Sequence, residues 1–154
     1  MAKDTKDLLK AKKLTFNLLK IRPRSEYELV AYLTRKGFSK EIIKQTIDYL
    51  SRLRLVDDLS FARAWAESKA KQSIGKTRLR FELLKKGLKP NIINQVIEET
   101  FESVDEEKTV RGLVQRMMQK YSKLDKDTAK RRLWSYLSRR GFSKDIVMDV
   151  MSQL

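Results

Sequence analysis

The stretch RKGFSK, Arg35–Lys40, decides the fold because the chain repeats it. Near copies follow as KKGLKP, Lys85–Pro90, and RRGFSK, Arg139–Lys144. Each copy has two cations, a glycine and a large apolar residue. Glycine readily adopts the left-handed conformation that ends many helices, and a serine or a proline just after it suits the start of the next helix. Each copy therefore predicts a junction between two helices.

Apolar residues flank each glycine at helical spacing. Leucines four residues apart precede the glycines: Leu29 and Leu33, Leu79 and Leu83, Leu133 and Leu137. Groups of three apolar residues follow them: Ile42, Ile43 and Ile47, then Ile92, Ile93 and Ile97, then Ile146, Val147 and Met151. Residues at these spacings share one face of a helix. Each glycine thus joins two helices that bury their apolar faces.

A third helix is predicted before each pair, over 3–20, 57–72 and 105–121. Pro23 ends the first of these, and Ser25 with Glu28 has the spacing of a capping box. Asp57 or Asp58 is the expected cap of the second. The fold class is therefore all-α, with about nine helices in three tandem three-helix units at 1–56, 57–104 and 105–154. We expect an elongated, slightly curved array with small interfaces between units.

The composition excludes several classes of function. The 154 residues contain no Cys and no His, so disulfides, His-based metal sites and Ser-His triads are ruled out. No apolar run approaches the roughly 18 residues of a membrane span, and the N-terminus lacks the apolar core of a secretion signal. We expect a cytoplasmic protein with no membrane partner. The apolar positions are used inside the units and no spare heptad seam remains, so we expect a monomer.

The charge is strongly positive. The chain has 35 Lys and Arg against 20 Asp and Glu, a net charge of +15. Such a surplus attracts nucleic acid, acidic protein surfaces and anionic membranes. The three units have 14 basic and 6 acidic, 9 and 7, and 12 and 7 residues, respectively. The excess therefore lies in the first and third units.

Two short motifs resemble catalytic or metal sites and are given structural interpretations. Gly75-Lys76-Thr77 is similar to the end of a phosphate-binding loop, but Ala70 stands where the first glycine should be, so Gly75 is expected to begin a helix. Val56-Asp57-Asp58 contains an acidic pair without further ligands nearby, so helix capping is expected. We predict no catalytic residue, no metal and no cofactor.

The cation pairs and the aromatic residues each have two interpretations. Cations in the last turn of a helix complement its macrodipole, but the pairs would also form a row of anion contacts along an elongated body. AKRRLWSYLSRR, residues 129–140, has more charge than a helix end requires and favours a functional surface. Core packing is the main interpretation of the aromatic residues, and base stacking is the alternative; these residues are Phe38, Phe61, Trp65, Trp134 and Phe142.

An ordered set of motifs resembles the RecX family, the bacterial regulators of the RecA recombinase. RPRSEYEL (Arg22–Leu29) looks like the R-x-R-S-x-x-E-L opening of the family, and LTRKGF follows at the family's spacing. LVDDLSFARAW (Leu55–Trp65) resembles its D-D-x-x-[FY]-A segment, and GKTRLRFELLKKGL (Gly75–Leu88) its G-x-x-x-[IL]-x-x-x-L-x-x-[KR]-G segment. The third unit matches more loosely. The resemblance covers about Leu18 to Leu154.

The resemblance implies tandem three-helix repeats and a function without catalysis. RecX proteins bind RecA, chiefly as the filament on single-stranded DNA, and are thought to lie in its helical groove. The implied consequences are inhibition of ATP hydrolysis, strand exchange and coprotease activity, and blocked filament growth. Matching positions expected to be structural, together with the repeat glycines, are Ser25, Glu28, Gly37, Asp57, Asp58, Phe61, Gly75, Gly87 and Gly141. The candidate partner or anion contacts are Arg22, Arg24, Arg35, Lys36, Lys76, Arg78, Lys85, Lys86, Arg131, Arg132, Arg139 and Arg140.

Two other classes of function stay open. A basic helical module would bind DNA directly without RecA, with an affinity that falls steeply with salt. Weak binding to single- and double-stranded DNA is expected in either case. A helical scaffold would recruit an unrelated acidic protein and leave RecA activity unchanged.

Overall fold

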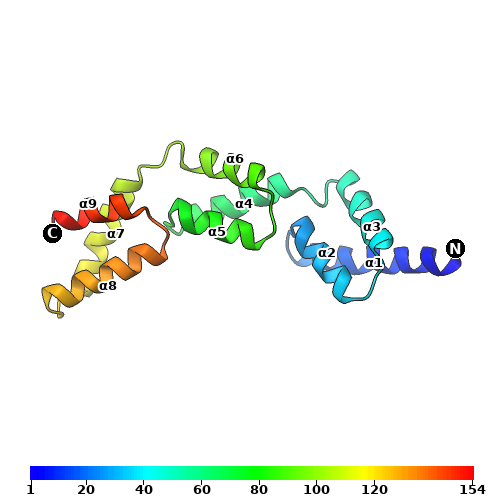
Figure 1. The fold of residues 1–154 in the computed structure, drawn as a ribbon, viewed down its shortest axis with the longest axis horizontal. Helices are drawn as coiled ribbons and strands as arrows, with labels where there is room; N and C mark the ends of the chain where they lie inside the picture. Colours follow the sequence, from blue (N-terminus) through cyan, green and yellow to red (C-terminus); the bar gives the residue numbers. More distant parts are fainter.

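The computed structural model describes residues 1–154 and consists of nine α-helices without a strand. In chain order they are α1 (Ala2–Ile21), α2 (Glu26–Arg35), α3 (Lys40–Arg52), α4 (Asp58–Ala70), α5 (Lys76–Lys85), α6 (Pro90–Phe101), α7 (Glu106–Lys120), α8 (Lys126–Arg139) and α9 (Lys144–Ser152). Figure 1 shows α1–α3, α4–α6 and α7–α9 as groups that follow one another along an elongated molecule, with the chain ends at its opposite ends. The predicted all-α fold is confirmed, and the curvature stays a prediction.

Each group of three helices has a hydrophobic core of its own. The three separate clusters of buried side chains lie in α1–α3, α4–α6 and α7–α9, respectively, the first including Val56 just beyond α3. The six leucines that precede the glycines are fully buried, two in each cluster: Leu29, Leu33, Leu79, Leu83, Leu133 and Leu137. Their predicted core role is confirmed. No hydrophobic core is therefore shared between units.

The three repeat glycines end helices as predicted. Gly37, Gly87 and Gly141 have φ values of 86°, 72° and 81°, in the left-handed region. Ser39 and Ser143 then cap α3 and α9 by accepting hydrogen bonds from the third backbone amide beyond them. In the second copy Lys89 makes no side-chain cap, and Pro90 takes the first helical position. The sequence thus fixes where each helix turns into the next.

The predicted caps of the other helices are also present. Ser25 and Glu28 form a complete capping box at α2, and Asp57 accepts a hydrogen bond from the amide of Ser60 at α4. Gly75 starts α5, in agreement with its structural interpretation. Asp58 has a role that the sequence did not indicate. Its Oδ1 accepts a hydrogen bond of 2.9 Å from the amide of Glu26 and so joins two units.

The aromatic residues serve the cores to different degrees. Phe61 and Phe142 are buried, which confirms core packing for these two. Phe38, Trp65 and Trp134 are partly buried and pack against the edges of their clusters. None of the nine helices combines the length and the apolar character needed to cross a membrane.

Candidate partner-binding surface

The first and second units meet where α2 begins and α5 ends. The hydroxyl of Ser25 donates a hydrogen bond of 2.7 Å to the carbonyl oxygen of Lys86. A Cβ on Gly87 would lie 2.1 Å from Cγ of Tyr27, so this glycine is required by contact as well as by its φ. We call this contact the first junction.

A carboxylate closes the first junction. Glu28 accepts hydrogen bonds from Arg22 (Nη2–Oε1 2.9 Å) and from Lys86 (Nζ–Oε1 3.0 Å). Burial opposes the ionisation of Glu28, but the hydrogen bonds from Arg22, Lys86 and the Ser25 amide outweigh it and lower its pKa to about 2. Glu28 is therefore ionised at neutral pH, with one cation from each unit beside it. Arg22 and Lys86, both predicted partner contacts, have this partner inside the chain.

The second and third units meet through the same parts of the fold, where α5 begins and α8 ends. The amide of Gly75 donates to the carbonyl of Arg140 at 2.7 Å, and the amide of Thr77 donates to the carbonyl of Gly141 at 3.2 Å. A Cβ on Gly141 would lie 2.3 Å from the backbone nitrogen of Arg78. We call this contact the second junction.

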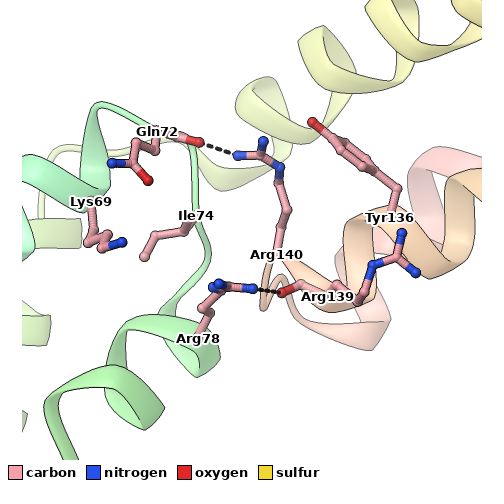
Figure 2. Close-up of a pocket in the computed structure, with 7 residues that line it drawn as sticks. All are labelled: Lys69, Gln72, Ile74, Arg78, Tyr136, Arg139 and Arg140. Carbon is pink, nitrogen blue, oxygen red and sulfur yellow. Dashed lines mark hydrogen bonds between the residues drawn. The ribbon is translucent and has the colours of Figure 1, made fainter. Parts of the chain in front are cut away.

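Arginine side chains also cross the second junction, as Figure 2 shows. Arg78 donates a hydrogen bond of 3.0 Å from Nη1 to the carbonyl of Arg139, and Arg140 donates to the carbonyls of Gln72 and Ser73. The guanidinium of Arg140 also lies 5.0 Å from the centre of the Tyr136 ring. At the second junction, backbone carbonyls thus accept the hydrogen bonds of the cations, whereas at the first junction the Glu28 carboxylate accepts them.

A hollow of about 250 Å³ opens at the second junction, and we call it the junction hollow. Its lining comes from α4, the α4–α5 loop, α5 and α8 (Figure 2): Lys69, Gln72, Ile74, Arg78, Tyr136, Arg139 and Arg140. Four of these seven residues are cations, and none is acidic. Outside the lining, the carboxylate of Glu82 pairs with Arg78 at 3.0 Å and with Lys69 at 3.5 Å. Burial opposes ionisation of Glu82, but hydrogen bonds from Trp65 and Arg78 lower its pKa.

Further cations lie on neighbouring faces of α5 and α8. We define the α5–α8 basic surface by Arg78, Phe81, Lys85, Arg131, Arg132 and Arg139, all of which are exposed. Arg131, Arg132 and Arg139 line a shallow hollow of about 570 Å³ with Tyr121, Thr128 and Ser135. Arg78, Phe81, Lys85 and Arg139 line another of about 440 Å³. Arg139 borders both of these and the junction hollow, so the three hollows adjoin.

The other predicted contacts lie apart from this surface. Arg35 and Lys36 are exposed at the end of α2, where a Cβ on Gly37 would meet no atom within 4 Å. Lys76 lines a separate hollow with Arg80 and Phe101. The Nε atom of Arg24 is buried without a hydrogen-bond partner. The structure therefore brings together the predicted contacts Arg78, Lys85, Arg131, Arg132 and Arg139, whereas Arg24, Arg35, Lys36 and Lys76 lie elsewhere.

Among the residues of these surfaces that sequence reasoning missed are Lys69, Gln72, Tyr136 and Phe81. The first three reach the junction hollow only because two units meet there, so no local pattern indicates them. Phe81 had a signal. It lies between Leu79 and Leu83 on α5, off the face that these two bury, and its side chain is 58% exposed beside the Nζ of Lys85. A single exposed apolar residue is common on protein surfaces, but Phe81 lines the same hollow as the cations Arg78, Lys85 and Arg139.

Family models match most of the chain. Those described as the first, second and third three-helix domains of RecX match residues 11–50, 57–97 and 105–151. The regulatory protein RecX of Amycolatopsis mediterranei is 34% identical over 145 residues, which cover 94% of this chain and 82% of that protein. That of Chlorobium phaeobacteroides is 31% identical over 154 residues, which cover 98% and 97%.

Two solved structures have the same fold. The crystal structure of RecX from Lactobacillus salivarius superimposes with a TM-score of 0.79 at 20% identity and covers 97% of both chains. A second crystal structure of a regulatory protein RecX has a TM-score of 0.80 at 17% identity and covers 97% of this chain and 73% of that one. At these identities the likeness supports the fold alone.

Proposed function

This chain belongs to the RecX family, and from that premise we propose that it binds the RecA recombinase and its filament on single-stranded DNA. RecX regulatory proteins are non-enzymatic regulators. The proposed effect is inhibition of ATP hydrolysis, strand exchange and coprotease activity by limiting filament growth. The proposed compartment is the cytoplasm, the proposed active form is a monomer, and the proposed unit boundaries are 1–56, 57–104 and 105–154.

The observation that carries this proposal is the α5–α8 basic surface on an elongated body. Arg132 and Arg139 have no hydrogen bond or ion pair from their side chains within the chain, and Arg131 donates only to the hydroxyl of Thr128. Their charge is therefore available to an acidic protein face and to nearby phosphates. Three linked units also span a longer stretch of a filament than one unit, and linked weak contacts gain affinity through effective concentration.

The predicted contacts receive different proposed roles. Arg131, Arg132 and Arg139 are proposed to meet RecA, with Lys85 and Phe81 at the edge of the same contact. Arg22 and Lys86 are proposed to set the shape of the array, because both are already bound to Glu28. Arg24, Arg35, Lys36 and Lys76 are proposed as secondary contacts elsewhere on the body.

Direct binding to DNA without RecA is the second candidate, and the net charge of +15 favours it. It requires an affinity that falls steeply as salt rises, through release of counterions from the phosphates. That affinity would be the same with and without RecA. Weak DNA binding in addition to RecA binding is part of the main proposal.

The test is the ATP hydrolysis of RecA on single-stranded DNA, titrated with this protein with and without excess single-strand-binding protein. Inhibition well below one chain per RecA would support action on the filament. Inhibition only near the amount that coats the DNA would mean competition for phosphates and support the second candidate. No inhibition would overturn both and leave the helical scaffold.

Charge reversal tests the contact surface. The double change Arg131→Glu and Arg132→Glu is expected to raise the concentration for half-inhibition roughly tenfold or more at physiological salt, because attraction becomes repulsion. Lys3→Glu with Lys6→Glu, at the exposed start of α1, is the control with the same charge change. Equal effects of the two pairs would remove Arg131 and Arg132 from the contact.

A further inference from the structure

The two junctions have the same geometry and different charges. In each, the start of the middle helix of one unit meets the glycine end of the middle helix of the next unit. The corresponding residues, first junction then second, are Arg22 and Gln72, Ser25 and Gly75, Glu28 and Arg78, Lys86 and Arg140, and Gly87 and Gly141. The repeat therefore allows a residue-by-residue comparison of how the junctions are closed.

Glu28 is the residue whose counterpart differs most in charge. At the first junction its carboxylate lies between Arg22 and Lys86, at 2.9 and 3.0 Å. At the second junction the corresponding residue is the cation Arg78, which faces the end of α8. Lys86 thus has a carboxylate across the junction, whereas Arg140 has only the carbonyls of Gln72 and Ser73.

The charge around the junction hollow is unbalanced as a result. Lys69, Arg78, Arg139 and Arg140 line it, and Glu82 beside it neutralises only part of their charge. The hollow of about 250 Å³ accommodates a group larger than water. Arginine is suited to phosphate because its planar guanidinium offers two parallel donors, and lysine adds a compact charge.

We infer that the junction hollow binds a phosphate group, which neutralises the second junction as Glu28 neutralises the first. The ligand would contact Lys69 of the second unit and Arg140 of the third at once (Figure 2). It would therefore strengthen the contact between the two units. Two sources have this chemistry: a free phosphate such as inorganic pyrophosphate, and a phosphodiester of a nucleic-acid backbone. The inference goes beyond the proposed function, because the site exists in the chain without RecA.

Lys69 and Lys71 provide a matched pair of variants. Lys69 lines the junction hollow, whereas Lys71, two residues on, points elsewhere and pairs with Glu67 at 3.4 Å. Lys69→Gln and Lys71→Gln remove the same charge from the same end of α4, and neither removes a backbone contact of the junction. Inorganic pyrophosphate and an oligothymidylate are titrated separately by calorimetry into the full chain at low salt, without RecA.

The expected result is saturable binding of at least one probe that Lys69→Gln weakens about tenfold, as for one lost charged hydrogen bond. Lys71→Gln should bind within about twofold of the unaltered chain, since it loses only a remote charge. If Lys69→Gln weakens the binding of both probes, the site takes any phosphate group. If it weakens pyrophosphate binding alone, the site takes a free phosphate. If it weakens oligothymidylate binding alone, the site takes a phosphate of the nucleic-acid backbone.

Two results would overturn the inference: no saturable binding of either probe, or equal weakening by Lys69→Gln and Lys71→Gln. The backbone amide signals of Gly75 and Thr77 give a second measurement by NMR. Because both amides donate across the junction, they should shift on addition of the bound probe, and unchanged signals would also contradict the site. If the protein did not inhibit RecA, the phosphate site could still be present. If the phosphate site were absent, the proposed inhibition of RecA would still stand.

Discussion

The first junction is closed by a side-chain carboxylate, and the second by backbone groups and arginines. At the first, Glu28 joins Arg22 and Lys86. The side chains of Ser25 and Asp58 each bond to the backbone of the other unit. At the second, the amides of Gly75 and Thr77 bond directly to the end of α8. The two junctions therefore have the same geometry, but different groups bond across them. The two joints should therefore respond to different perturbations.

The largest expected effect comes from the glycine of the second junction. Gly141→Ala would place a methyl group on a residue with φ of 81° and 2.3 Å from the backbone nitrogen of Arg78. Left-handed strain and overlap together should lower the free energy of unfolding by roughly 2–4 kcal/mol. Gly37→Ala is the control, because Gly37 has φ of 86° and no atom within 4 Å of its added Cβ. Its cost should be about 1 kcal/mol.

Urea denaturation followed by tryptophan fluorescence measures both glycine variants. Trp134 packs against the core of the third unit, and Trp65 against that of the second. Equal losses of stability in the two variants would mean that the third unit does not rest on α5 in solution. The corresponding contact at the first junction, between Gly87 and Tyr27, would then also need a test in solution.

A smaller effect is expected at the first junction from loss of its carboxylate. Glu28→Gln leaves Arg22 and Lys86 side by side with a neutral acceptor, and should lower the free energy of unfolding by roughly 2 kcal/mol. Glu26→Gln is the matched control on the same helix, because its side chain is exposed and makes no hydrogen bond or ion pair. A change no greater than that of the control would show that Glu28 contributes little to the joint.

The smallest effect is the pH dependence that Glu28 gives to the first junction. The pKa of Glu28 is lowered from 4.5 to about 2 in the folded chain. A carboxyl whose pKa is lower in the folded chain stabilises the fold at pH values above its pKa in the unfolded chain. This stabilisation is lost as the pH falls toward the pKa of the folded chain. The difference in unfolding midpoint between the unaltered chain and Glu28→Gln should therefore shrink from pH 4.5 to pH 2. A constant difference over this window would contradict the proposed charge of Glu28.

Most of the fold could be predicted from the sequence because its determinants are local. The buried leucine pairs, the repeat glycines and the caps each depend on residues a few positions apart. The junctions depend on residues far apart in the chain, and both Ser25–Lys86 and Arg78–Arg139 are separated by 61 positions. Helical periodicity shows which faces are apolar, but not which unit ends meet.

The candidate surface could be predicted only in part for the same reason. Charge counts pointed to Arg131, Arg132 and Arg139, whose exposed positions on α8 follow from the helical pattern. The same counts could not distinguish Arg22 and Lys86, which are bound to Glu28, from cations that face solvent. Lys69 and Tyr136 enter the junction hollow from different units, and so only the assembled array reveals them.

The bare end of α2 has a consequence for how such a chain changes length. Every unit buries its own core, and Gly37 lies at the same helix end that the preceding unit covers at Gly87 and Gly141. A further unit placed before the first could pack the start of its middle helix against the end of α2 without any change to the existing cores. Adding whole units at this end would therefore lengthen the array in equal steps.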